Sequence, residues 1–147
     1  MHISRAGIDD VADVSRLFDE YRQFYAQAPA YTACERYIKA RLTHDESVIF
    51  VARAADREIL GFTQLYRSFC SVEMRAICYL YDLYVAVDAR RTGVGRALLE
   101  RAREFADAAG AVRLTLETQT GNTAGQALYE SLGWKRDVEF FTYHLEL

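Results

Sequence analysis

The stretch from Tyr81 to Leu99 constrains the fold more than any other part of the chain. An apolar strand pattern runs there into a basic turn that contains Gly93 and Gly95, and this turn opens an amphipathic helix. Backbone N–H groups in the first turn of a helix have no intrahelical partner, and aligned peptide dipoles place about half a positive charge there. Because glycine has no Cβ, a ligand can approach the backbone closely. The sequence therefore predicts a strand–turn–helix unit that can hold a phosphate group.

Charge around this turn supports a specific anion site. The chain has a net charge of -3, whereas the segment from Asp88 to Arg103 is basic. Its charged residues are Arg90, Arg91, Arg96, Arg101 and Arg103 against Asp88 and Glu100. A basic island in an acidic chain argues against general attraction to nucleic acid. The dinucleotide-binding fingerprint is incomplete because Leu98 stands where its third glycine is required, and no phosphate-binding loop ending in Gly-Lys-Ser/Thr is present.

Length and composition predict one domain over residues 1–147, since the chain has a single proline and no Gly/Ser-rich linker. Neither a signal peptide nor a membrane-spanning apolar run is recognised. Cys34, Cys70 and Cys78 are odd in number and unclustered, which favours reduced thiols in a cytoplasmic protein. The three histidines have no metal-ligand spacing, so no metal site is predicted.

Hydrophobic periodicity predicts a mixed α/β fold. The expected strands are residues 1–6, 48–54, 59–67, 76–87, 112–118 and 139–147, with a further short strand near Trp134. The expected helices are residues 9–25, 31–42, 93–109 and 122–132. The strands at 48–54 and 59–67 form a predicted hairpin. The order of elements predicts a sheet of six to seven strands, mixed but mostly antiparallel, flanked by about four helices.

Two motifs further along the chain carry a resemblance to a known family. They are Leu114-Thr-Leu-Glu-Thr-Gln-Thr-Gly-Asn122 and Ala127-Leu-Tyr-Glu-Ser-Leu-Gly-Trp134. Together with Arg90-x-x-Gly93-x-Gly95, they resemble the GCN5-related N-acetyltransferase (GNAT) family over essentially the whole chain. The resemblance implies the GNAT-type acyl-CoA N-acyltransferase fold, splayed between the strands at 76–87 and 112–118. It also implies transfer of an acetyl group from acetyl-CoA to a primary amine, which could be a small amine, an amino acid or a peptide or protein amine.

The resemblance further implies which residues bind acetyl-CoA. The pantetheine arm is expected to pair with the strand backbone, as a peptide does when it adds to a sheet edge. The diphosphate is expected at the basic turn, and Asn122 caps the next helix while contacting the cofactor arm. The predicted cofactor-binding residues are Leu83, Tyr84, Val85, Arg90, Arg91, Thr92, Gly93, Val94, Gly95, Arg96, Asn122 and Tyr129.

The same resemblance implies direct attack by a neutral amine. Tyr129 is predicted as the acid that protonates the leaving thiolate, and the alternative is a packing role. Glu117 is predicted as the base, with a water relay and a purely structural carboxylate as alternatives. Diamine acetyltransferases of the family carry a glutamate base where this chain has Tyr81, so a polyamine substrate is disfavoured. Asp82 follows it, but adjacent strand residues face opposite sides and Asp82 need not inherit that role.

The predicted acceptor site is aromatic. Tyr21, Tyr25, Tyr31 and Tyr81 are its candidate residues, and Tyr66 and Tyr143 could contribute, because aromatic rings can surround a cationic amine. Tyr21 and Tyr25 could instead be core-facing helix residues. Small members of the family often dimerise, so a homodimer is expected, with the C-terminal strand as contact. The alternative function is a non-catalytic acyl-CoA-binding sensor of the same fold. Nucleic-acid and membrane partners are not expected.

Overall fold

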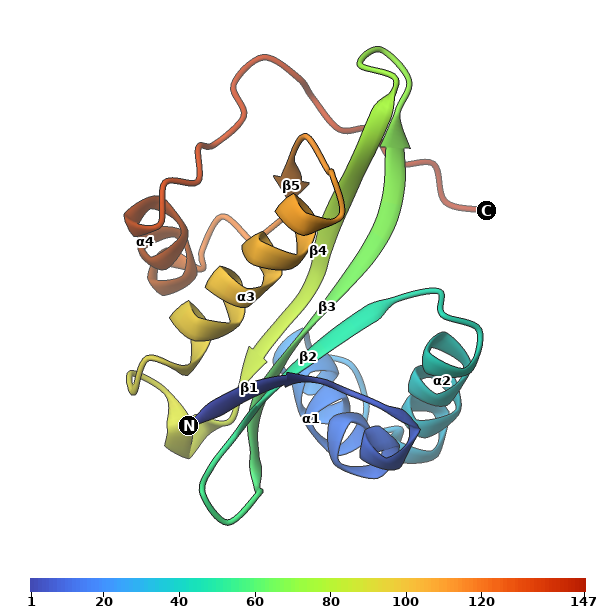
Figure 1. The fold of residues 1–147 in the computed structure, drawn as a ribbon, viewed down its shortest axis with the longest axis vertical. Coiled ribbons are helices and arrows are strands. Elements are labelled where there is room, and N and C mark those ends of the chain that lie inside the picture. The colour runs from blue at the N-terminus through green and yellow to red at the C-terminus, as the bar shows by residue number, and fades with distance from the viewer. The chain divides into compact units, whose positions relative to one another are not determined.

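The computed structural model describes residues 1–147 and contains two compact units, Met1–Glu117 and Thr118–Leu147. The first unit holds one sheet with helices on both faces (Figure 1). In chain order its elements are β1 (His2–Arg5), α1 (Val11–Phe24), α2 (Tyr31–Thr43), β2 (Val48–Arg53), β3 (Ile59–Cys70), β4 (Arg75–Val85), α3 (Val94–Ala108) and β5 (Leu114–Thr115). Single-domain organisation stays a prediction from the sequence.

The sheet has five strands in the order β1-β2-β3-β4-β5. The pairs from β1 to β4 are antiparallel, and only β5 runs parallel to its neighbour β4. The predicted hairpin at 48–54 and 59–67 is confirmed by the pairing of β2 with β3. A mixed, mostly antiparallel sheet is therefore confirmed as well.

β2 lies between β1 and β3 and is buried on both faces. Successive strand residues point to opposite sides, so a strand between two helical layers must be apolar throughout. Ile49 and Val51 belong to the core cluster shared with α1 and α2, whereas the ring of Phe50 packs edge-on against Phe105 of α3 at 5.7 Å between centroids. Hence α1 and α2 cover one face of the sheet and α3 covers the other (Figure 1).

The segment after α1 is held in place by a buried side chain. α1 ends at Phe24, and Ala26 has a left-handed backbone with φ 59°. Asp19, itself buried on α1, accepts a hydrogen bond of 2.9 Å from the N–H of Ala30 at the start of α2. This bond fixes the turn that carries Tyr25 and Gln27, which both line the cavity described below.

The second unit contains α4 (Thr123–Ser131). Asn122 is its N-cap, as predicted, because the side-chain oxygen accepts the N–H of Gly125 at 3.2 Å. Gly133 follows the helix with φ 86°, the left-handed conformation that glycine adopts easily after a helix. No helix in the chain combines the length and apolar character needed to cross a bilayer.

The strand prediction was wrong at the C-terminus. The segment 139–147 contains no strand, nor does the region near Trp134, so the sheet has five strands and not six or seven. Alternating apolar and polar residues permit an extended conformation, but a strand forms only where a neighbour accepts and donates main-chain hydrogen bonds. The strand predicted at 112–118 is likewise reduced to Leu114–Thr115.

Candidate functional site

The far edge of β4 is open along its C-terminal half. β5 pairs with β4 only at Cys78↔Leu114 and Tyr79↔Thr115, whereas pairing with β3 continues to Gly61↔Val85. From Leu80 to Val85, β4 therefore has a neighbour on one side only. The predicted splay between the strands at 76–87 and 112–118 is confirmed.

A β-bulge at Tyr81 explains where the splay begins. Gln64 pairs with Asp82 and Leu65 pairs with Leu80, which leaves Tyr81 without a partner in β3. An extra residue bends the bulged strand and increases its twist. The bulge lies just past the end of the β5 ladder, so β4 turns away from β5 at this point.

The phase of the β3–β4 ladder decides which backbone groups the open edge presents. The N–H of Ala86 donates to the carbonyl of Leu60 at 2.9 Å. Because facing groups alternate along an antiparallel strand, Tyr84 also bonds β3, while Leu83 and Val85 direct their N–H and C=O groups outward. The carbonyl of Val85 agrees with this assignment, since it accepts the Nε–H of Arg90 at 3.1 Å. An extended ligand could pair with these groups as an added strand.

The turn after β4 leads directly to the N-terminus of α3. Thr92 Oγ1 donates to the carbonyl of Ala89 at 2.7 Å, and Arg91 and Gly93 have left-handed backbones with φ 62° and 91°. Gly93 is the N-cap and supplies no side-chain hydrogen bond, so the first-turn N–H groups of α3, which include those of Val94 and Gly95, are not capped by a side chain. A helix N-terminus of this kind can bind an anion with its main chain.

The three arginines near this turn are placed differently. The guanidinium of Arg90 lies 5.6 Å from the ring centroid of Tyr84 and bonds back to Val85, so it stiffens the turn. Arg91 is exposed, and Arg96 forms a loose ion pair with Glu100 at 3.9 Å. All three keep positive charge close to the start of α3.

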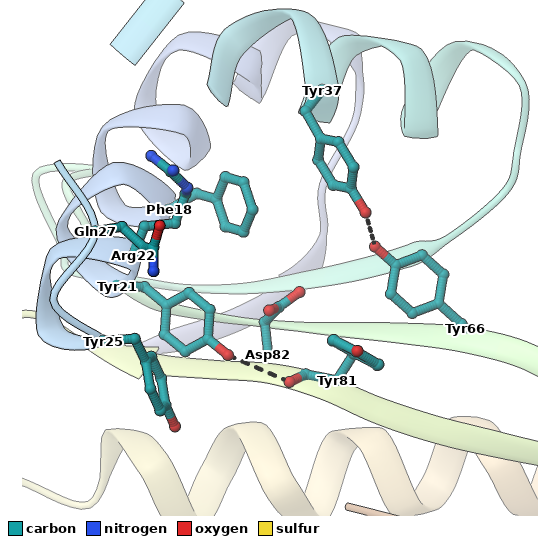
Figure 2. Close-up of a pocket in the computed structure, with 9 residues that line it drawn as sticks. All are labelled: Phe18, Tyr21, Arg22, Tyr25, Gln27, Tyr37, Tyr66, Tyr81 and Asp82. Carbon is teal, nitrogen blue, oxygen red and sulfur yellow. Dashed lines mark hydrogen bonds between the residues drawn. The ribbon is translucent and has the colours of Figure 1, made fainter. Parts of the chain in front are cut away.

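A cavity of about 260 Å³ lies between α1, α2 and the bulged part of the sheet (Figure 2). Aromatic side chains make up most of its wall, and a single carboxylate, that of Asp82, faces it. The lining residues are Phe18, Tyr21, Arg22, Tyr25, Gln27, Tyr37, Tyr66, Tyr81 and Asp82. The bulge contributes directly to this wall, because it brings Tyr81 and Asp82 to the same cavity.

Asp82 is 4 % exposed and is surrounded by neutral donors. Gln64 Nε2 donates to its Oδ2 at 2.6 Å, and Gln64 Oε1 accepts the hydroxyl of Ser47 at 2.7 Å. The second bond fixes the amide of Gln64 with its NH₂ group toward Asp82. Burial raises the pKa of Asp82, and the hydrogen bonds from Gln64 and Tyr21 act in the opposite direction.

The tyrosine hydroxyls of the cavity form two groups. The hydroxyl of Tyr21 lies 3.4 Å from the carbonyl of Tyr81, and those of Tyr37 and Tyr66 are 2.6 Å apart. Burial raises the pKa of Tyr21, and the charge of Asp82 adds to this effect. Burial also raises the pKa of Tyr66, and the hydrogen bond with Tyr37 raises it further. The hydroxyls of Tyr21 and Tyr66 therefore stay neutral at physiological pH.

The other predicted site residues lie as follows. Tyr21, Tyr25, Tyr66 and Tyr81 line the cavity, whereas Tyr31 does not; its hydroxyl donates to Glu35 at 3.5 Å. Glu117 is exposed and is not part of the cavity wall.

Three predicted residues lie in the second unit. Asn122 Nδ2 donates to Thr118 Oγ1 at 3.0 Å in addition to its capping bond. The ring of Tyr129 packs at 6.2 Å from that of Trp134. Tyr143 is 89 % exposed.

Sequence reasoning missed Tyr37 and gave Asp82 no role. Tyr37 belongs to α2, and its spacing of three residues from Cys34 is the one sequence signal that it lies on the side of the helix that borders the cavity. No residue type announces the bulge at Tyr81, and it is the bulge that brings Asp82 and Tyr81 to one cavity.

Comparison with known proteins decides the family. Residues 12–134 match the family model for the acetyltransferase (GNAT) family. The chain belongs to the GNAT family. It is 42 % identical over 147 residues to the uncharacterized N-acetyltransferase YhfO of Bacillus subtilis, covering all of this chain and 98 % of that protein. The crystal structure of a probable acetyltransferase shares 36 % identity and a TM-score of 0.95, with 100 % and 98 % of the two chains covered.

A more distant relative carries a specific name. The [ribosomal protein bS18]-alanine N-acetyltransferase of Salmonella typhimurium is 33 % identical over 100 residues, which cover 68 % of this chain and 56 % of that protein. The predicted family, the GNAT fold and the assignment as an N-acetyltransferase are thus confirmed. GNAT proteins generally use acetyl-CoA.

Proposed function

We propose that this GNAT enzyme transfers the acetyl group of acetyl-CoA to a primary amine held in the tyrosine-lined cavity. One observation carries the proposal: a single short segment of β4 borders both the cavity and the open sheet edge. Tyr81 and Asp82 line the cavity, and Leu83 and Val85 present the open edge that leads to the α3 turn. At about 3.3 Å per strand residue, a ligand arm along Leu83–Val85 ends beside the cavity.

The residues around β4 and α3 fit the coenzyme. The open edge supplies main-chain partners for an amide-bearing arm, and the N-terminus of α3, which has no side-chain cap, supplies donors for a diphosphate. Leu83, Tyr84 and Val85 would hold the arm, and the turn from Arg90 to Arg96 would hold the diphosphate. Family resemblance adds Asn122 and Tyr129 to these contacts. The bound coenzyme supplies the acetyl thioester.

Proton transfer is the remaining task of the protein. A lysine-like amine has a pKa near 10.4, so only about one molecule in a few thousand is neutral at pH 7. Glu117 lies outside the cavity wall, so it takes the proton from the amine through a water relay. Tyr129 donates a proton to the thiolate that leaves. A homodimer and a cytoplasmic location remain predictions from the sequence.

The test measures acetylation of a panel of amines by wild type, Tyr129→Phe and Glu117→Gln, together with acetyl-CoA affinity by calorimetry. Tyr129→Phe should lower kcat by about 10²–10⁴-fold while acetyl-CoA still binds. Glu117→Gln should suppress the rate mainly at low pH. Tyr79→Phe, which removes a hydroxyl outside the cavity, should behave as wild type and serves as the matched control.

Two outcomes would count against the proposal. Tight binding of acetyl-CoA with no turnover on any amine would favour the acyl-CoA sensor. An unchanged rate and pH profile in Tyr129→Phe would remove Tyr129 as the acid.

A further inference from the structure

We infer that the acceptor is a small primary amine with one ammonium group and no carboxylate beside it, and that Asp82 receives this ammonium inside the ring of tyrosines. The inference rests on the proposed acetyl transfer and names the class of its substrate. Its basis is the charge, the wall chemistry and the size of the cavity.

When it is ionised, the carboxylate of Asp82 has no positive partner in the protein. Its hydrogen-bond donor Gln64 and its neighbour Tyr21 are neutral, and none of the observed ion pairs involves it. Burying an ionised carboxylate is costly unless a cation pairs with it. A ligand ammonium in the cavity would supply that cation.

Arg22, the one cationic residue of the wall, is already engaged. Its Nη1 donates to the carbonyl of Ala28 at 3.3 Å and lies 3.6 Å from Asp19 Oδ1. A carboxylate on the ligand would therefore face Asp82, and the charge of Arg22 is already paired with Asp19. This arrangement selects against amino acids.

Aromatic rings complete the recognition of a cation. Tyr21 and Tyr25 meet edge to face at 5.1 Å, and Tyr66 and Tyr81 do so at 5.6 Å, so ring faces and edges surround Asp82 (Figure 2). Cations bind favourably over such faces. The hydroxyls of Tyr21 and Tyr66 stay neutral, so they add no charge that would require a second ammonium.

The cavity opens to solvent and has room for a small group around the ammonium. About 260 Å³ lies below the usual range for pockets that hold drug-sized molecules. A short alkyl or aryl chain fits this space. One carboxylate pairs with one ammonium, so a second ammonium at the far end of a diamine finds no second carboxylate in the wall.

Binding of four matched probes tests the inference: pentylamine, 1-pentanol, norleucine, which is pentylamine with an added carboxylate, and 1,5-diaminopentane. Dissociation constants are measured at pH 7 by calorimetry and by NMR shifts of the tyrosine rings. The proteins are wild type, Asp82→Asn and Asp9→Asn, the last an exposed residue that undergoes the same charge change outside the cavity.

Pentylamine should bind wild type and Asp9→Asn equally, and Asp82→Asn about tenfold to a hundredfold more weakly. In wild type, 1-pentanol and norleucine should bind more weakly than pentylamine, and 1,5-diaminopentane no more tightly. Equal affinity for pentanol and pentylamine would overturn the inference without reference to any variant. So would unchanged affinity in Asp82→Asn, equal affinity for norleucine, or tighter binding of the diamine.

Turnover separates this inference from the proposed function. Acetylation of norleucine in preference to pentylamine would overturn the inference and leave acetyl transfer standing. Binding of pentylamine through Asp82 without acetylation of any amine would overturn acetyl transfer and leave the ammonium site standing.

Discussion

Replacing Gly61 by alanine should damage both the stability of the protein and its coenzyme site. Gly61 lies on β3 opposite Val85 of β4. A Cβ at this position would lie 2.7 Å from the carbonyl oxygen of Tyr84, 3.2 Å from Cα of Val85 and 3.1 Å from Cγ1 of Val94. The first two neighbours are backbone atoms, so β4 itself has to move.

Overpacking of this kind typically costs about 1–3 kcal/mol. Replacing a strand glycine by alanine stabilises the fold by roughly 0.5–1 kcal/mol, because glycine loses more backbone freedom on folding than alanine does. The net loss is therefore about 0–2.5 kcal/mol, with a mid-value of about 1 kcal/mol, which corresponds to a fall in Tm of roughly 2–4 °C. Coenzyme A should also bind more weakly, because the displaced residues belong to the open edge and the start of α3.

The assay is thermal and urea unfolding of the variant, with coenzyme A affinity from calorimetry. Gly7→Ala is the matched control, since its φ of -115° suits alanine and a Cβ there meets nothing within 4 Å. That variant should equal wild type or gain slightly in stability. The reasoning is refuted if Gly61→Ala matches Gly7→Ala in both unfolding midpoint and coenzyme affinity.

Two further predictions concern Asp82 and Asn122. Because burial raises the pKa of Asp82, ionisation of this carboxyl reduces stability as pH rises from the unfolded value near 3.9 through the higher folded value. Asp82→Asn should therefore be more stable than wild type at pH 7, and urea unfolding should show this gain vanishing toward pH 3; a constant difference across pH would contradict it. Asn122→Ala removes the cap of α4 and the bond to Thr118, at a cost of about 1 kcal/mol, which hydrogen exchange in α4 should detect; unchanged protection there would contradict the capping role.

Local sequence patterns predicted most elements because their causes are local. The glycines at 93, 110 and 133 mark helix boundaries through left-handed backbones, and Asn122 marks the start of α4 by its capping side chain. The alternating pattern at 139–147 wrongly predicted a strand. A strand also needs a neighbouring strand as its hydrogen-bond partner, and alternation does not specify one. The open edge of β4 was predicted from the family resemblance and not from hydrophobic periodicity.

The acceptor cavity was predicted only in part, because its geometry depends on non-local pairing. Tyr21 and Tyr25 could be proposed from their helix, but the register shift opposite Gln64 and Leu65 that brings Asp82 to the cavity has no signature in residue type. Nor does sequence reveal that Arg90 folds back on Val85 and Tyr84. These contacts depend on which strands pair and in which register.

The central claim is that main-chain groups of β4 and α3 hold the coenzyme. An NMR titration of the isotopically labelled protein with coenzyme A tests it most directly. The account predicts that the amide signals of Leu83, Val85, Val94 and Gly95 shift most and become protected from hydrogen exchange. It is contradicted if these four amides stay unchanged at saturating coenzyme A.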